Sequence, residues 1–265
     1  MKAINTIALA LSISAAAAAA PAMAASAPLA AVKPTVILVH GAFADAGSWN
    51  GVAARLRTDG YKVIGAANPL RSVKGDAAVV SDIVKSVKGP VVLVGHSYGG
   101  AVISTAANGN PNVKSLVYVA AFAPDEGETA LELSGRFPGG TLGQALAEPV
   151  ALASGGKDFY IQQDKFHQQF AADVPQAQAQ LMAISQRPIA EAALTEASGA
   201  PAWKNLPSYF IYGSGDKNIP AAALGFMAER AKSRKTVEIK NASHVVMTSN
   251  PAAVAGLIED AAKGN

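Results

Sequence analysis

The residues best suited to chemistry are a serine in a glycine-rich motif and a histidine near the end of the chain. The motif reads GHSYGG at 95–100 and begins at the last residue of the apolar run VVLVG at 91–95. Because a helical segment follows, Ser97 is expected at a sharp strand-to-helix turn. Such a turn strains the backbone and needs very small neighbours, which Gly95 and Gly99 provide. Ser97 is therefore a candidate nucleophile for acyl transfer, and an incidental serine in a glycine-rich turn is the alternative.

A serine hydroxyl becomes a good nucleophile only when a base takes its proton, and the chain has four histidines. His244 lies on a loop between the last predicted strand and the final predicted helix, at the same sheet edge as Ser97. It is the predicted base, and a structural histidine is the alternative. The others are assigned elsewhere. His40 should hold the loop after the first strand, His96 should point away from the hydroxyl, and His167 lies in an inserted region.

The base in turn needs a carboxylate that fixes its tautomer and stabilises the imidazolium. Asp216, in GSGDKNIP at 213–220, follows a predicted buried strand by a glycine-rich turn and is the preferred candidate. Asp125 follows the preceding predicted strand and stays a rival, because either residue gives the chain order serine, aspartate, histidine. Three further aspartates are interpreted as solvated helix surface of the inserted region: Asp158, Asp164 and Asp173.

Acyl transfer also needs hydrogen-bond donors for the oxyanion that develops in the transition state, each contributing about 3–4 kcal/mol. One expected donor is the backbone N–H of Tyr98, the residue after the nucleophile. The other should come from HGAF at 40–43, the loop after the first predicted strand, with Ala42 as the preferred amide. Phe43 would then line the substrate pocket, although plain core packing explains it equally well.

Six short apolar runs predict the strands of a mostly parallel sheet flanked by helices, an α/β architecture. The predicted strands are 35–40, 61–66, 91–96, 115–120, 208–212 and 236–240. Each is a near-continuous apolar run, so burial on both faces is expected. Asn250 followed by Pro251 predicts the start of the last helix. Parallel strands would bring the candidate serine, aspartate and histidine to one edge of the sheet.

One region, at about 127–205, breaks this alternation. It has no β-branched strand run and is rich in Ala, Gln and Leu, which predicts a largely helical cap inserted between two sheet strands. Glycine and proline at 138–140 and 155–156 suggest loops or hinges inside it. The insertion is interpreted as a lid over the substrate or, alternatively, as a purely structural helical layer.

The first 24 residues are predicted to be a cleaved secretory signal. Lys2 precedes an apolar run at 4–20, and the small residues AMA at 22–24 suit a signal peptidase. The run is interrupted by polar residues and is short for a bilayer span of roughly 20 residues, so a stable membrane anchor is the less favoured interpretation. Cleavage is expected after Ala24, or alternatively after Ala27. The protein is therefore expected to be exported, either to the periplasm or out of the cell.

Composition narrows the chemistry further. The chain has 265 residues, of which 50% are hydrophobic and 15% charged, which excludes a disordered chain, and none is cysteine. The lack of cysteine removes thiol nucleophiles and Cys-ligated metals, and no metal or organic cofactor is expected. The formal net charge is +3, but the basic residues are scattered, so no nucleic-acid partner is expected. After a linker at 25–33, residues 34–265 should form one domain.

Four motifs carry a family resemblance: HGAF at 40–43, GHSYGG at 95–100, GSGDKNIP at 213–220 and ASHVVM at 242–247. With these in order, the chain resembles the α/β-hydrolase superfamily from about Pro34 to its end. It is most similar to small cofactor-free serine esterases and their hydroxynitrile-lyase-like relatives, which carry a helical cap after the sixth strand. The resemblance implies these roles: Ser97 as nucleophile, Asp216 as acid, His244 as base, and Ala42 and Tyr98 as oxyanion donors.

Differences from related families at two positions reduce the set of reactions that the protein is expected to catalyse. Haloalkane dehalogenases and epoxide hydrolases of this fold carry an aspartate where Ser97 stands, and plant-type hydroxynitrile lyases carry a lysine where Val245 stands. The expected activity is that of a carboxylesterase, which cleaves small to medium esters through an acyl-enzyme. A lactonase, amidase or perhydrolase with the same residues is one alternative, and a non-catalytic ligand-binding module is another.

Overall fold

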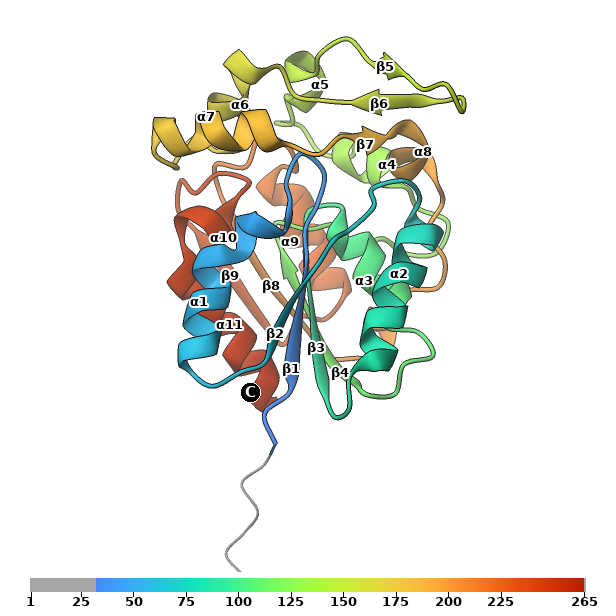
Figure 1. The fold of residues 1–265 in the computed structure, drawn as a ribbon, viewed down its shortest axis with the longest axis vertical. Helices are drawn as coiled ribbons and strands as arrows, with labels where there is room; N and C mark the ends of the chain where they lie inside the picture. The colour runs from blue at the N-terminus through green and yellow to red at the C-terminus, as the bar shows by residue number, and fades with distance from the viewer. Residues whose placement is uncertain (1–31, 265) are drawn as a thin grey trace, which may run out of the picture. The chain divides into compact units, whose positions relative to one another are not determined.

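The computed structural model describes residues 32–264, so the predicted signal peptide at 1–24 and most of the linker at 25–33 lie outside the described residues. A six-stranded sheet runs through the centre in the order β2-β1-β3-β4-β8-β9 (Figure 1). All of its strand pairs are parallel. The strands are β1 (Thr35–Val39), β2 (Val63–Ala66), β3 (Val91–His96), β4 (Val113–Val119), β8 (Ser208–Gly213) and β9 (Lys235–Ile239). The six predicted strands are confirmed, with small shifts at their ends.

Burial differs between the middle and the edges of this sheet. Every residue of β1, β3 and β8 is buried, as expected for apolar runs with helices on both faces. The expectation of full burial is wrong for β2 and β9, the two edge strands, which are partly exposed. An edge strand has a neighbour on only one side, so solvent reaches its outer flank.

Helices cover the sheet on both sides (Figure 1). On one side α1 (Asn50–Thr58) packs against α11 (Pro251–Lys263), and on the other α2 (Val73–Ser86) packs against α3 (Gly99–Ala106). Helix α11 begins at the predicted Pro251, although the side chain of Asn250 makes no capping hydrogen bond. The other core elements are η1 (Ala46–Trp49), α9 (Ala221–Arg230) and α10 (Val246–Ser249). In the part of the chain that the structure describes, every helix is too short or too polar to cross a membrane.

A cap lies between β4 and β8 along the chain and covers the carboxyl ends of the strands (Figure 1). Its helices are α4 (Ala130–Gly135), α5 (Leu142–Ala145), α6 (Gln163–Phe170), α7 (Gln176–Ser185), α8 (Glu191–Thr195) and η2 (Ala202–Lys204). It also holds a three-stranded antiparallel sheet that the sequence did not predict: β5 (Val150–Ala151), β6 (Lys157–Phe159) and β7 (Ile189–Ala190). The cap lies between the strands at 113–119 and 208–213, at the position along the chain expected for the insertion at about 127–205.

The cap is fastened to the core at the loop after β2. The guanidinium of Arg71 lies 2.6 Å from the Asp158 carboxylate in β6, and it donates to the Pro188 carbonyl at 3.0 Å. The backbone amide of Ala190 in β7 donates to the Leu70 carbonyl at 3.0 Å. The interpretation of Asp158 as solvated helix surface is therefore wrong, because the residue is buried in a strand and neutralised by Arg71.

Candidate active site

Ser97 sits on a strained turn between β3 and α3. Its φ angle is +54°, in the left-handed region that costs a residue with a side chain about 1 kcal/mol or more. A Cβ atom on Gly95 would lie 2.6 Å from the Gly99 carbonyl oxygen, and one on Gly99 would lie 2.7 Å from the Val39 carbonyl oxygen. The prediction that the turn needs very small neighbours is therefore confirmed. The same tight packing fixes the direction of the Ser97 side chain.

His244 and Asp216 form a buried pair. The Nδ1 atom of His244 lies 2.6 Å from Oδ2 of Asp216, and both side chains are almost fully buried. The second oxygen, Oδ1, accepts the backbone amides of Asn218 at 2.8 Å and Ile219 at 3.0 Å. Because a carboxylate can only accept, Nδ1 of His244 carries the proton and Nε2 is left able to take one.

The rival carboxylate lies elsewhere. Asp125 is 2.5 Å from the ammonium group of Lys204, and that hydrogen bond lowers the pKa of Asp125 below its usual value. Among the described contacts, Asp216 and not Asp125 reaches the imidazole of His244. The structure thus brings together the serine, histidine and preferred aspartate of the sequence analysis around one sheet edge.

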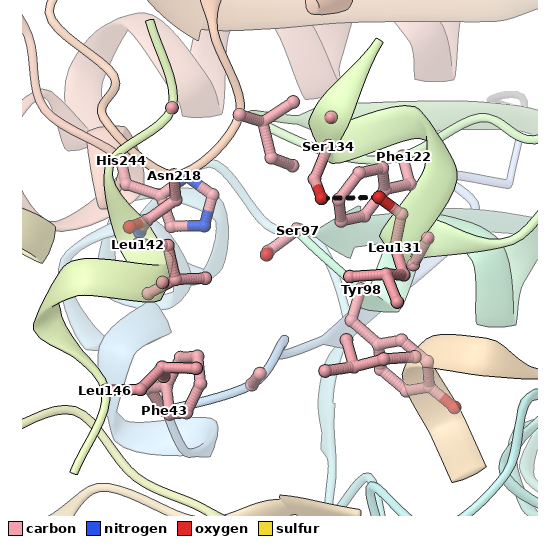
Figure 2. A pocket seen from close by; sticks show the side chains of 17 residues that line it. Phe43, Ser97, Tyr98, Phe122, Leu131, Ser134, Leu142, Leu146, Asn218 and His244 are labelled. Carbon is pink, nitrogen blue, oxygen red and sulfur yellow. Dashed lines mark hydrogen bonds between the residues drawn. The ribbon is translucent and has the colours of Figure 1, made fainter. Parts of the chain in front are cut away.

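Ser97 and His244 face the same pocket, whose volume is about 290 Å³ (Figure 2). Most of its wall is apolar and comes from both the core and the cap: Phe43, Phe122, Ala130, Leu131, Leu142, Leu146, Leu194 and Ile219. Between the hydroxyl of Ser97 and the ring of His244 the described structure has no direct hydrogen bond, although both side chains point into the same space. The cap therefore forms part of the pocket, as the lid interpretation expects.

The loop after β1 is pressed against the serine turn. A Cβ atom on Gly41 would lie 2.6 Å from Cβ of Ser97, so the backbone at this point is within contact distance of the candidate nucleophile. Ala42 and Tyr98 both line the pocket, and among the described residues neither backbone amide donates to a protein acceptor. The Phe43 amide is already engaged by the Arg187 carbonyl at 3.0 Å. The two predicted oxyanion donors thus have no protein acceptor among the described residues and remain candidates for binding a ligand oxygen.

His40 holds this loop in place, as expected. Its Nε2 accepts the backbone amide of Asn68 at 3.1 Å, and its carbonyl accepts the Asn68 side chain at 2.9 Å. Burial lowers the pKa of the His40 imidazole, so the ring is neutral and can accept. Phe43 has a φ of +59° and packs edge-on against Phe170 of the cap, with ring centroids 6.2 Å apart. Phe43 therefore belongs both to the pocket wall and to the core.

His96 and His167 take no part in the pocket. The Nε2 atom of His96 lies 3.2 Å from the His244 carbonyl oxygen, so this side chain is directed away from the Ser97 hydroxyl and braces the loop of the base. Burial and the neighbouring His244 lower the pKa of His96 well below its usual value, which keeps the ring neutral. His167 lies in α6 and contacts the Val174 carbonyl within the cap, at 2.9 Å.

Tyr98 turns its hydroxyl away from the pocket (Figure 2). The hydroxyl donates to Oδ2 of Asp76 at 2.9 Å, and the backbone amide of Arg71 lies 3.1 and 3.2 Å from the two oxygens of that carboxylate. Burial raises the pKa of the Asp76 carboxyl, and burial and Asp76 together raise the pKa of Tyr98. Asp76 thus fixes the residue whose amide is a predicted oxyanion donor.

Sequence reasoning assigned pocket apolarity to the insertion as a whole, but it singled out neither the individual cap leucines nor Asn218. The cap leucines carry no local signal, because they differ in no visible way from other apolar residues of the insertion. Asn218 belongs to the GSGDKNIP motif, so its position close to Asp216 could be predicted from the sequence. Its position on the pocket wall could not. Over residues 32–264, no group of three His, Asp or Glu side chains is arranged to hold a metal ion.

Comparison with known proteins shows which family this chain belongs to. Residues 36–257 match the model of the alpha/beta hydrolase family. A carbendazim hydrolyzing esterase of Nocardioides sp. (strain SG-4G) is 31% identical over 138 residues, which cover 44% of this chain and 57% of that protein. The putative chloroplastic methylesterase 11 of Arabidopsis thaliana is 26% identical over 251 residues, which cover 86% of this chain and 63% of that protein. The matches thus span less than two thirds of either relative.

Solved structures show the same fold. The crystal structure of polyneuridine aldehyde esterase aligns with a TM-score of 0.75 at 19% identity, over 86% of this chain and 99% of the other. An extracellular alpha/beta-hydrolase from a Paenibacillus species aligns with a TM-score of 0.69 at 24% identity, over 86% of this chain and 98% of the other. At these identities the likeness concerns the fold alone.

Proposed function

The chain belongs to the alpha/beta hydrolase family, and on that premise we propose that it is a carboxylesterase with Ser97 as its nucleophile. The observation that carries the proposal is the meeting of a strained Ser97 and the buried His244–Asp216 pair in one apolar pocket. The names of the relatives, an esterase and a putative methylesterase, agree with ester hydrolysis. The apolar wall suits a small to medium apolar acyl or alcohol group.

The first half of the reaction forms an acyl-enzyme. Oγ of Ser97 attacks the ester carbonyl carbon while Nε2 of His244 takes the hydroxyl proton. Asp216 stabilises the imidazolium through the 2.6 Å contact to Nδ1. The carbonyl oxygen becomes an oxyanion and accepts hydrogen bonds from the amides of Ala42 and Tyr98. The intermediate then collapses, and the alcohol leaves with the proton from His244.

The second half repeats these steps with water. His244 takes a proton from a water molecule, which attacks the carbonyl carbon of the acyl-serine. The same two amides hold the second oxyanion, and Ser97 leaves with the proton from His244. The products are the carboxylic acid and the free enzyme. Every proton taken is returned within the cycle, and each step uses only side chains, backbone amides and water.

Turnover of p-nitrophenyl acetate and butanoate tests this proposal. The wild-type protein should hydrolyse both, and Ser97→Ala should abolish the reaction, because no other residue on the strained turn can attack. Ser86→Ala, at the exposed end of α2, is the matched control and should keep the wild-type rate. Retained activity in Ser97→Ala would refute the assignment. Lactones and amides run beside these esters would distinguish the related hydrolase activities.

We also propose that the protein is exported, on the strength of the N-terminal sequence pattern. Expression of the full chain in a Gram-negative host, followed by N-terminal sequencing of the periplasmic fraction, tests this directly. Cleavage after Ala24 would leave a chain that begins at Ala25, and cleavage after Ala27 one that begins at Pro28. A cytoplasmic product that keeps the N-terminal residues would contradict the proposal.

A further inference from the structure

One buried nitrogen atom of a residue that lines the pocket has no hydrogen-bond partner among the described residues. Asn218 lies two residues after Asp216, beside His244, and its side chain is 4% exposed (Figure 2). Its amide nitrogen, Nδ2, is fully buried and, among the described residues, donates to no acceptor. Folded proteins rarely leave a buried donor unpaired, because its lost hydration is not replaced. Because Asn218 also lines the pocket, a ligand bound there is a candidate partner for this donor.

A chain of hydrogen bonds fixes which way this carboxamide is turned. Nε2 of Gln169, in cap helix α6, donates to the Lys217 carbonyl at 3.0 Å and to Oδ1 of Asn218 at 2.8 Å. Oε1 of Gln169 accepts the hydroxyl of Thr141 at 2.8 Å. Because a backbone carbonyl can only accept, the group facing Lys217 must be the Gln169 nitrogen. Asn218 must then present its oxygen to Gln169, which leaves Nδ2 on the other side.

The other polar side chains around the pocket are already hydrogen-bonded or take part in the proposed reaction. The hydroxyl of Ser134 donates to the Leu131 carbonyl at 2.7 Å (Figure 2). Nδ1 of His244 is paired with Asp216, and the remaining polar atoms of His244 and Ser97 belong to the proposed reaction. Among the described side chains of the pocket wall, the Asn218 amide is thus the donor left for binding. Most of the pocket wall is apolar, so one hydrogen bond there can discriminate strongly between substrates.

We propose that Nδ2 of Asn218 donates a hydrogen bond to a second oxygen of the substrate, outside the scissile ester group. The preferred substrates are then esters that carry an ether, hydroxyl or carbonyl oxygen on the acyl or alcohol part, within an otherwise apolar body. This inference rests on the proposed esterase function and deepens it. Asn218 acts in specificity, and its side chain is separate from the backbone amide that holds Asp216.

Two pairs of esters that differ by one CH₂-to-oxygen exchange test the inference. p-Nitrophenyl methoxyacetate and p-nitrophenyl butanoate probe the acyl part, and 2-methoxyethyl acetate and butyl acetate probe the alcohol part. For each pair the ratio of kcat/KM, ether over hydrocarbon, is measured in wild type and in Asn218→Leu. The intrinsic reactivity of each ester is the same for both enzymes, and damage to Asp216 would lower both rates, so both effects cancel in the comparison.

The ratio should fall roughly fivefold in Asn218→Leu for at least one pair, as for the loss of one hydrogen bond. Which pair responds tells which part of the substrate carries the oxygen. Ser134→Ala is the matched control, because the Ser134 hydrogen is already used, and it should leave both ratios unchanged. If Asn218→Leu does not fold, as judged by circular dichroism, Asn218→Ala removes the same donor and gives the same readout.

Unchanged ratios in both pairs would overturn the inference while leaving the esterase proposal intact. An equal fall in Ser134→Ala would also overturn it, because the effect would not be specific to Asn218. A wild-type protein that hydrolyses none of the four esters would instead refute the proposed function, and the inference with it. The two failures are therefore distinguishable.

Discussion

At the scale of single residues, Asp216 divides its two oxygens between different tasks. Oδ2 accepts Nδ1 of His244, and Oδ1 accepts two backbone amides of its own loop. The carboxylate is therefore held rigidly, and in turn it holds the imidazole in one tautomer. A base that is already oriented loses little freedom when it takes the serine proton, which is how a buried carboxylate contributes to the rate.

Replacing Asp216 by Asn should lower kcat for p-nitrophenyl butanoate by roughly 10³- to 10⁴-fold, because an amide can stabilise the wrong tautomer of His244. Asp125→Asn is the control and should change kcat little, since the Asp125 carboxylate is paired with Lys204 away from the imidazole. Steady-state kinetics of the two variants checks this. Equal losses in both, or a larger loss in Asp125→Asn, would contradict the assignment.

Removal of the buried hydroxyls of Tyr98 and Tyr209 should have different effects on the free energy of unfolding. Tyr98→Phe deletes the donor to the buried Asp76 carboxylate, so the free energy of unfolding should fall by about 1–3 kcal/mol. The hydroxyl of Tyr209, in β8, is buried and has no partner among the described residues. Tyr209→Phe should therefore be neutral or stabilising. Urea unfolding of both variants measures the difference, and a greater loss in Tyr209→Phe would be the contrary result.

At the scale of elements, the cap is tied to the core on two sides. Arg71 and Asp158 join the loop after β2 to β6. On the far side, Glu128 precedes α4 and receives two hydrogen bonds from Arg230 at the end of α9, at 2.8 and 2.7 Å. Arg136, at the end of α4, lies 3.0 Å from the same carboxylate. These contacts hold the pocket-lining helix α4 over Ser97.

The Glu128 cluster should make stability depend on pH. Burial by itself would raise the pKa of Glu128, but hydrogen bonds from Arg230 and the Asp125 amide, together with the charges of Arg230 and Arg136, outweigh it and hold the pKa below 4.5, the usual value. A carboxyl with a lowered folded pKa stabilises the protein fully above its unfolded pKa, and the contribution disappears as pH falls through the folded pKa. Urea unfolding of wild type and Glu128→Gln should therefore differ near neutral pH, and the difference should shrink as the pH falls below 4.5 and through the lowered folded pKa. A difference that grows in acid would contradict this.

Local patterns predicted the sheet but not the small structure of the cap. The six core strands have four to seven residues each, and most of these residues are apolar or β-branched, so the strands were recognisable by composition. Strands β5, β6 and β7 have two or three residues each, too few to show any alternation. β6 also begins with Lys157 and Asp158, and Asp158 is buried only because Arg71, far away in the sequence, neutralises it.

The candidate site was likewise predictable from the sequence only in part. The sequence motifs pointed to Ser97, Asp216 and His244, because each follows a predicted strand at its carboxyl end. The free donor on Asn218 was not predictable, since its orientation depends on Gln169, which a separate helix of the cap supplies. Contacts between residues distant in the sequence, rather than local propensity, therefore determine the features that would select a substrate.

At the scale of the whole molecule, no disulfide can contribute to stability, because the chain has no cysteine. Stability must come from the core, where the central strands are buried between α1 and α11 on one side and α2 and α3 on the other. The candidate catalytic residues Ser97, Asp216 and His244 lie at the carboxyl edge of this sheet, where the cap covers them. In such folds the buried core usually provides stability, and the loops at the strand ends carry the functional residues.

Exhaustive dialysis against EDTA should leave kcat/KM for p-nitrophenyl butanoate unchanged. Every step of the proposed reaction is assigned to protein groups and water, so removal of divalent ions removes nothing that the mechanism uses. The measurement compares dialysed enzyme with and without added Mg²⁺, Ca²⁺ or Zn²⁺. A loss of activity that one of these ions restores would contradict the proposed mechanism.

Mass spectrometry after treatment with a fluorophosphonate is a direct test of Ser97 as the nucleophile, because this reagent modifies only a serine that is activated as a nucleophile. We expect one phosphonyl group per chain, located on Ser97, and no adduct on Ser97→Ala. We also expect greatly slowed labelling in His244→Ala, in which the base is lost. A wild-type protein that stays unlabelled, or one that is labelled at another residue, would contradict the assignment of Ser97.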